Sequence, residues 1–236
     1  MYRNKIILVC FHSITILYSF YNAINVKYMN NNFKSKNINL VFNSKPIFEN
    51  FNLSIKSFEK TSIKGRSGSG KTTLFNLVMG FIKPDSGEII FEGNLINRKT
   101  ISEVRKKIAW LPQNPNIIGR GKVKEQIMLP FTFHCNKPLM PDEKTLFGEF
   151  EKLNLDKSIL ESSFDEISGG ERQRIGIMIC KLLKRDLMLL DEPTSALDKV
   201  NLGSVVKYLC AENKTTILSA SHDDEWLSHC DNIIEL

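Results

Sequence analysis

The stretch from Gly65 to Thr73 constrains the fold more than any other part of the chain. It reads GRSGSGKTT, which has the spacing G-x-x-x-x-G-K-[ST] of a phosphate-binding loop. Its glycines let the backbone curl so that successive N–H groups point at phosphate oxygens. Lys71 can reach the β and γ phosphates, and the Thr72 hydroxyl can bind Mg²⁺. The predicted nucleotide-binding residues here are Gly65, Arg66, Ser67, Gly68, Ser69, Gly70, Lys71, Thr72 and Thr73.

The segments on either side of this loop provide the context that it requires. Residues 60–64 can form a short strand, and residues 74–79 read as a helix. The positive end of that helix would face the same phosphates. A Gly/Ser-rich turn that matches the spacing by accident is the alternative, and the strand, loop and helix together favour nucleotide binding.

A second motif follows an apolar run of strand length at residues 187–190. The run ends in Asp191 and Glu192, and a similar strand at residues 215–220 ends near His222. Strands that alternate with helices indicate a mainly parallel sheet with the phosphate loop at its carboxyl edge. An aspartate at this edge can hold Mg²⁺, and Glu192 can polarise a water in line with the γ phosphate.

The composition limits the domain size, the binding partners and the cysteine chemistry that the chain can have. The 236 residues are 42% hydrophobic and 25% charged, which suits one sizeable domain or one domain with a small insertion. The net charge of +6 is scattered along the chain, so we expect a solvated surface and no nucleic-acid partner. The five cysteines form no C-x-x-C pair, which favours structural thiols in a reducing compartment.

The first 32 residues are the hardest part of the chain to interpret. Residues 6–26 carry no Lys, Arg, Asp or Glu and follow Arg3 and Lys5, so a signal peptide or a single-span anchor is one reading. Polar residues dilute this stretch, and a secreted protein would meet little ATP. We therefore favour an unimportant hydrophobic leader or a true translation start at Met29.

The rest of the chain contains three segments with different residue patterns. Residues 36–55 alternate like antiparallel strands, and turn residues at 84–87 precede a further strand at 88–91. Residues 114–167 contain four prolines followed by helical spacing, which is typical of an inserted helical subdomain. Ser168 and Glu171 then form an S-x-x-E capping box that opens a helix with a buried apolar stripe.

The order of these motifs resembles the ATP-binding domain of ABC ATPases, from about Asn37 to the C-terminus. The resemblance implies an α/β fold with a P-loop NTPase core and a mainly parallel sheet. It also implies an antiparallel β subdomain at the N-terminus and an inserted α-helical subdomain. The implied boundaries are residues 33–236 for the domain and 113–175 for the insertion, and the implied cofactors are ATP and Mg²⁺.

The resemblance also assigns roles to individual residues. Phe42 stands where the family has an aromatic residue that stacks on adenine, and Asp191 stands where it has the magnesium aspartate. Ser195 to Asp198 match the loop that crosses the dimer interface. The remaining assignments are the catalytic residues Glu192, His222, Gln113 and Lys71, the magnesium ligands Thr72 and Gln113, and the ATP-binding signature residues Ser168, Gly169, Gly170 and Glu171.

The signature adds a second anion site to a chain that already has a phosphate loop. Ser168 lies at the start of a helix, where N–H groups can bind an anion. Such a site makes sense if it caps the γ phosphate held by another subunit. The family forms head-to-tail dimers of this kind, so the resemblance implies a homodimer or a paired ABC ATPase subunit.

Most members of the family drive transport through a membrane permease. After residue 26 this chain shows no membrane segment, so we expect a peripheral subunit on the cytoplasmic face that docks through residues 114–167. Residues 123–130 and 149–155 look similar to stand-alone ATPases associated with metal or iron export. A non-transport ABC ATPase acting on ribosomes, DNA or cluster assembly, and a nucleotide-gated regulator, are the alternatives.

Overall fold

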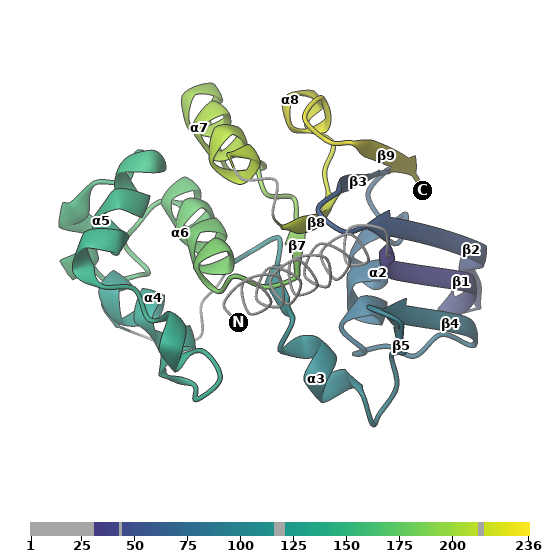
Figure 1. The fold of residues 1–236 in the computed structure, drawn as a ribbon. Coiled ribbons are helices and arrows are strands. Elements are labelled where there is room, and N and C mark those ends of the chain that lie inside the picture. The colour runs from purple at the N-terminus through teal and green to yellow at the C-terminus, as the bar shows by residue number, and fades with distance from the viewer. Residues whose placement is uncertain (1–30, 43, 116–120, 212–214) are drawn as a thin grey trace, which may run out of the picture.

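A computed structural model describes residues 31–42, 44–115, 121–211 and 215–236. Two sheets and a group of helices make up the described chain (Figure 1). The strands are β1 (Asn31–Phe42), β2 (Lys45–Lys56), β3 (Lys60–Lys64), β4 (Ser86–Phe91), β5 (Asn94–Leu95), β6 (Ile108–Leu111), β7 (Leu187–Asp191), β8 (Thr216–Ala220) and β9 (Asn232–Glu235). The α-helices are α2 (Lys71–Val78), α3 (Ile101–Arg105), α4 (Val123–Thr132), α5 (Glu143–Lys152), α6 (Gly169–Leu182), α7 (Lys199–Cys210) and α8 (Asp224–Leu227). Two 3₁₀ turns, η1 (Lys137–Leu139) and η2 (Lys157–Glu161), lie between α4 and α6.

The central sheet has the strand order β6-β7-β8-β3-β9, and all of its pairs are parallel. Every residue of β7 and β8 is buried, as expected for parallel strands covered on both faces. Successive side chains of a strand point to opposite faces. Leu187 and Leu189 accordingly join the core beside α2, whereas Met188 and Leu190 join the core beside α6. The sheet therefore lies between two apolar cores, and its carboxyl edge is left for polar residues.

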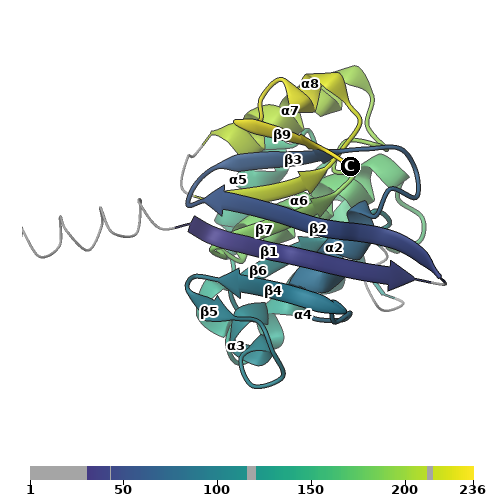
Figure 2. The ribbon, with the colours of Figure 1, turned by 90° about the vertical axis from the view of Figure 1, so that its right-hand side faces the viewer.

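The second sheet has the order β2-β1-β4-β5 and is antiparallel. It packs over α2 on the side away from α6 (Figures 1 and 2). Strand β1 begins at Asn31, ahead of residue 33, where the sequence predicts the domain to begin. Strand β4 begins at Ser86, inside the predicted turn, because Ser86 pairs with Asn39.

Helices α4 and α5 lie on the far side of α6 from the sheets (Figure 1). Their buried faces, including Ile127, Phe131, Leu146 and Phe150, join the core beside α6. Helix α4 continues through Pro130, which removes one backbone hydrogen bond close to the end of the helix. Pro130 therefore does not end a helix, whereas Pro138 and Pro141 lie between α4 and α5.

One feature of the sequence concerns membranes. Within the part of the chain that the structure describes, no helix is both long and apolar enough to cross a bilayer. The apolar stretch at residues 6–26, interpreted above as a leader, signal or anchor, lies outside the described residues.

Candidate functional site

The phosphate-binding loop connects β3 to α2 at the carboxyl edge of the parallel sheet, as the sequence predicts. Gly68 and Gly70 have φ angles of 79° and 105°, in the left-handed region that favours glycine. A Cβ on Gly70 would lie 2.8 Å from Cγ2 of Ile47, so this close approach of backbone to β2 also requires glycine. Helix α2 carries no acidic residue in its first turn, which leaves its positive end free to attract an anion.

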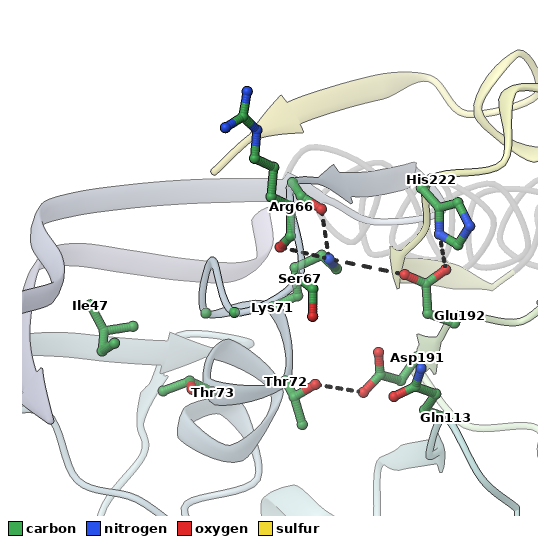
Figure 3. Close-up of a pocket in the computed structure, with 13 residues that line it drawn as sticks. Ile47, Arg66, Ser67, Lys71, Thr72, Thr73, Gln113, Asp191, Glu192 and His222 are labelled. Carbon is green, nitrogen blue, oxygen red and sulfur yellow. Dashed lines mark hydrogen bonds and ion pairs between the residues drawn. The ribbon is translucent and has the colours of Figure 1, made fainter. Parts of the chain in front are cut away.

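A pocket of about 520 Å³ opens in front of this loop (Figure 3). It is built from the loop, the start of α2, and the residues that follow β6, β7 and β8, all of which end at the same sheet edge. The lining residues are Ile47, Gly65, Arg66, Ser67, Gly68, Gly70, Lys71, Thr72, Thr73, Gln113, Asp191, Glu192 and His222.

Lys71 is held by the loop that it follows. Its ammonium donates hydrogen bonds to the carbonyl oxygens of Gly65, at 2.7 Å, and Arg66, at 3.3 Å. The same nitrogen lies 4.0 Å from Oε1 of Glu192, and both side chains are largely buried. A buried positive charge at the floor of an open pocket is suited to a polyanionic ligand.

Thr72 and Asp191 form the second polar pair in the pocket. The Thr72 hydroxyl donates to Oδ2 of Asp191 over 3.0 Å, and Asp191 is only 3% exposed. Burial raises the pKa of the Asp191 carboxyl, and the charge of Glu192 adds to this effect, while the Thr72 hydrogen bond opposes it. The pair presents oxygen ligands of the type that Mg²⁺ prefers. No cluster of three or more His, Cys, Asp or Glu side chains suited to a metal occurs among residues 31–42, 44–115, 121–211 and 215–236.

Glu192 and His222 face each other across the ends of β7 and β8. The Glu192 N–H donates to the carbonyl of Ala220 over 2.8 Å, which extends the sheet pairing and brings the two side chains together. Nδ1 of His222 lies 3.0 Å from Oε2 of Glu192. The Glu192 side chain is 9% exposed, whereas that of His222 is 72% exposed. The Glu192 carboxylate is therefore enclosed, and the His222 imidazole lies exposed at the mouth of the pocket.

The signature residues lie outside this pocket. Ser168 is exposed and caps α6, where its hydroxyl accepts the Glu171 N–H over 3.2 Å and its own N–H donates to Oε2 of Glu171 over 2.7 Å. The predicted capping box is thus confirmed. A Cβ on Gly170 would lie 2.9 Å from the carbonyl oxygen of Ala196, so the start of α6 approaches the 195–198 loop closely.

The pocket contains most, but not all, of the residues predicted for one nucleotide site. Ser69 and Phe42 do not line it, and Phe42 is 59% exposed at the end of β1. Ser168, Gly169, Gly170 and Glu171 do not line it either. The structure adds Ile47, which faces Gly70 from β2. No sequence signal separates Ile47 from the other apolar residues of β2.

Comparisons with known proteins agree with this geometry. The family model described as "ABC transporter" matches residues 48–195. The ABC transporter ATP-binding protein YxdL of Bacillus subtilis (strain 168) is 33% identical over 220 residues, which cover 90% of this chain and 82% of that protein. The "Probable iron export ATP-binding protein FetA" of Escherichia coli (strain K12) is 31% identical over 205 residues, which cover 85% of this chain and 89% of that protein.

Solved structures show the same fold. The ATP-binding cassette MJ0796, in a dimeric post-hydrolysis state bound to ADP and Pi, matches with a TM-score of 0.77 at 26% identity over 86% of this chain and 94% of that one. CbiO1 of Clostridium perfringens, described as part of the ABC transporter complex cbiONQ, matches with a TM-score of 0.73 at 25% identity over 87% of this chain and 84% of that one. These matches confirm the predicted resemblance and the predicted fold class. The chain belongs to the ABC transporter family, as one of its ATP-binding and ATP-hydrolysing proteins.

Proposed function

We propose that this chain is the ATP-driven motor subunit of a transporter whose membrane-spanning part is a separate protein, and that it works as a head-to-tail dimer. The observation that carries the proposal is the division of the predicted site. Lys71, Asp191 and Glu192 share one pocket, whereas Ser168, at the start of α6 where we expect an anion to bind, is exposed outside it. A second subunit would bring its own Ser168 to the open side of the pocket. The dimeric state of MJ0796 with ADP and Pi supports this arrangement.

The triphosphate of ATP would lie along the loop. Its backbone N–H groups and the Lys71 ammonium are placed to meet the phosphate oxygens, and Lys71 already lies among carbonyl groups that a stronger anionic partner would replace. Ser69 would contribute through its position in the loop. Phe42, exposed at the end of β1, is free to stack on the adenine, as is common for exposed aromatic side chains in nucleotide sites.

The residues present also fit Mg²⁺. Thr72 and Asp191 would hold it, and the side chain of Gln113 enters the same pocket from the end of β6. The buried Asp191 carboxylate, whose pKa is raised by burial, would gain a compensating positive charge. Held there by Thr72 and Asp191, Mg²⁺ would supply positive charge against the negative charge of the phosphates.

Glu192 is the proposed general base. Its carboxylate would accept a proton from a water as the oxygen of that water attacks the γ phosphorus, with ADP as the leaving group. His222, 3.0 Å away, fixes the orientation of the carboxylate and is exposed enough to contact the γ phosphate as well. Lys71 would stabilise the charge that develops on the transferred group.

The helical region, proposed as residues 113–175, would carry the docking surface for the permease within residues 114–167. Its described surface exposes the large apolar side chains of Leu129, Phe133 and Met140. Large apolar and aromatic side chains of this kind are common at protein interfaces. Docking there would place the subunit peripherally, on the cytoplasmic face of the membrane where ATP is available.

Replacement of Glu192 by glutamine tests the hydrolytic part of this proposal. Glu192→Gln keeps the shape and length of the side chain but removes its basicity. ATP binding should persist while turnover falls by about 10²-fold or more, and the ATP-bound dimer should accumulate during gel filtration with light scattering. Turnover at the wild-type rate in the purified variant would remove Glu192 from the role of base.

Purification from native membranes tests the transport part. A tagged subunit should copurify with a hydrophobic multi-span protein at a fixed stoichiometry. Copurification with ribosomal RNA instead would favour a ribosome-associated ATPase, and would contradict the proposed coupling to a permease.

A further inference from the structure

The backbone of Glu192 has an unfavourable conformation. Its φ angle is +50°, in the left-handed region that a residue with a Cβ rarely adopts. It also precedes Pro193, and a residue before proline favours an extended conformation. Such a conformation persists only where the surroundings hold it. The direction of the Glu192 side chain therefore depends on whatever fixes its peptide groups.

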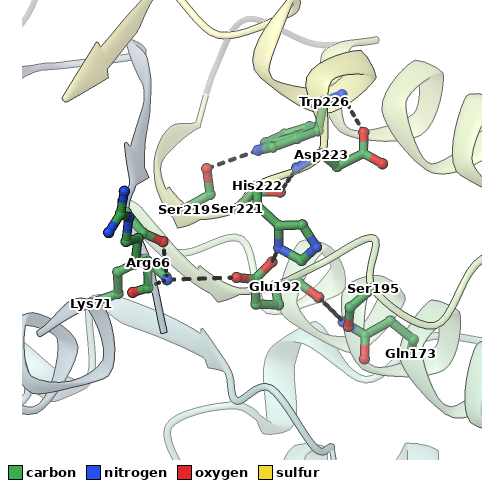
Figure 4. A network of polar contacts seen from close by, with 11 residues as sticks. Arg66, Lys71, Gln173, Glu192, Ser195, Ser219, Ser221, His222, Asp223 and Trp226 are labelled. Atoms are coloured by element: carbon green, nitrogen blue, oxygen red, sulfur yellow. Dashed lines mark hydrogen bonds and ion pairs between the residues drawn. The ribbon is translucent and has the colours of Figure 1, made fainter. Parts of the chain in front are cut away.

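Three hydrogen bonds converge on the Glu192 carbonyl oxygen (Figure 4). The Ser195 hydroxyl donates over 3.1 Å and the Ser195 N–H over 3.3 Å, both from the loop that follows. The third donor comes from a different element: Nε2 of Gln173, on α6, lies 3.1 Å from the same oxygen. Gln173 is 1% exposed, so neither group can exchange this bond for one to bulk water.

We propose that Gln173 is a positioning residue that fixes the carboxylate of Glu192 for ATP hydrolysis by holding its carbonyl group. The inference rests on the proposed role of Glu192 as base. Gln173 touches neither the pocket nor its ligand, since it does not line the pocket; it acts through the peptide of Glu192. Loss of the bond lets the peptide relax toward the extended conformation and turns the carboxylate away from Lys71 and His222.

The position of Gln173 on α6 gives this bond a second consequence. Ser168, the cap of the same helix, is the residue proposed to meet the phosphate held by a partner subunit. A helix transmits displacement along its axis because its backbone is continuously hydrogen bonded. Gln173 therefore links the helix that Ser168 caps directly to the peptide of Glu192.

Gln173→Met provides the direct test, because methionine keeps an unbranched side chain of similar length and lacks the donor. We expect kcat for ATP to fall about tenfold or more, with KM and the calorimetric affinity for ATP changed by less than twofold. Gln173→Glu, which keeps the shape and places an acceptor against the carbonyl, should lose at least as much. Ser195→Ala removes one of the three donors and should lose less than Gln173→Met.

A control on the same helix separates positioning from stability. Cys180 is buried in α6 and has no assigned role, so Cys180→Ala should lower the unfolding midpoint while kcat stays within about twofold of wild type. Gln173→Met should have a reduced kcat even if its unfolding midpoint falls no further than that of Cys180→Ala. If both variants lose activity in proportion to their loss of stability, Gln173 has only a structural role and the inference is wrong.

A double-mutant cycle tests whether Gln173 acts through Glu192. Glu192→Asp shortens the base and should leave slow turnover, measurable by release of labelled phosphate. Adding Gln173→Met to Glu192→Asp should then lower the turnover rate by less than about threefold, because the base is already misplaced. A further tenfold loss would overturn the inference. Wild-type turnover by Glu192→Asp would refute the proposed base itself, whereas slow Glu192→Asp with fast Gln173→Met would refute this inference alone.

Discussion

Replacement of Arg174 by methionine should lower the free energy of unfolding by about 3 kcal/mol, because Arg174 joins three helices. Its Nη1 donates to the carbonyl oxygens of Leu153, at 2.9 Å, and Asn154, at 2.8 Å, just after α5. The same nitrogen donates to Oδ1 of Asn201, in α7, at 2.7 Å. Nε donates to the Gly170 carbonyl within α6, at 3.2 Å. Arg174 is only 7% exposed.

Two opposing effects set the magnitude. A hydrogen bond from a charged donor contributes about 1.5–3 kcal/mol, so simple addition over the contacts of Arg174 would exceed about 6 kcal/mol. Burial removes water from the charge of Arg174 and thereby lowers its pKa, and methionine would not carry that desolvation cost. The carbonyls of Leu153 and Asn154 would, however, lose their donor. These terms leave about 3 kcal/mol, or a fall of about 6–12 °C in the unfolding midpoint.

Urea unfolding followed by circular dichroism measures this difference. Arg172→Met is the matched control, since Arg172 precedes Arg174 on α6 and lies nearer the surface. The control should stay within about 0.5 kcal/mol of wild type, with the same dependence on urea. A loss below about 1 kcal/mol for Arg174→Met would refute the reasoning, because it would mean that the hydrogen bonds only balance the cost of burying the charge.

Three further outcomes follow from single side chains. Hydrogen bonds from the side chain and the N–H of Thr145 lower the pKa of Asp142. The stabilisation from this carboxylate is therefore present above about pH 3.9 and is lost as the pH falls through the lowered value. Between pH 6 and pH 2.5, the unfolding midpoint of Asp142→Asn should accordingly change less than that of wild type. Burial raises the pKa of Cys230 to about 11, so peptide mapping after iodoacetamide treatment at pH 8 should find exposed Cys135 labelled far ahead of it. Lys71→Ala should weaken ATP affinity by calorimetry at least tenfold, because the charge that meets the phosphates is gone.

Local sequence signals predicted the parts of the fold that short segments determine. The loop at residues 65–73 and the capping box at Ser168 and Glu171 are each set by a few neighbouring residues, and the structure has both. The apolar run at residues 187–190 became a buried strand, and its carboxyl end delivers Asp191 to the pocket, since parallel strands end at a common edge.

Local sequence signals could not predict contacts between segments that are distant in the chain. The bond from Gln173 to the carbonyl of Glu192 joins two motifs that the sequence treats as separate, and its geometry depends on how α6 packs beside β7. The approach of Ile47 to Gly70 likewise depends on the placement of β2 over the loop. Burial also keeps Pro130 inside α4, since the packed face of the helix outweighs one lost hydrogen bond.

The division of the site between two chains is the central claim, and subunit mixing tests it most directly. Ser168→Arg spoils the start of α6 that would meet a partner's nucleotide, whereas Lys71→Ala spoils the pocket of its own chain. Each variant alone forms dimers in which both composite sites are damaged, so each should be nearly inactive. A mixed dimer has one intact site, which pairs Lys71 of one chain with Ser168 of the other.

Equal mixing of the two variants should therefore restore ATP hydrolysis to about a quarter of the wild-type rate, because half of the dimers are mixed and each carries one intact site of two. The measurement is steady-state phosphate release against the subunit ratio, which should peak at equal amounts and vanish at either end. Hydrolysis by Ser168→Arg alone at the wild-type rate, at a dilution where it is monomeric, would contradict the claim, as would a mixture no more active than its parents.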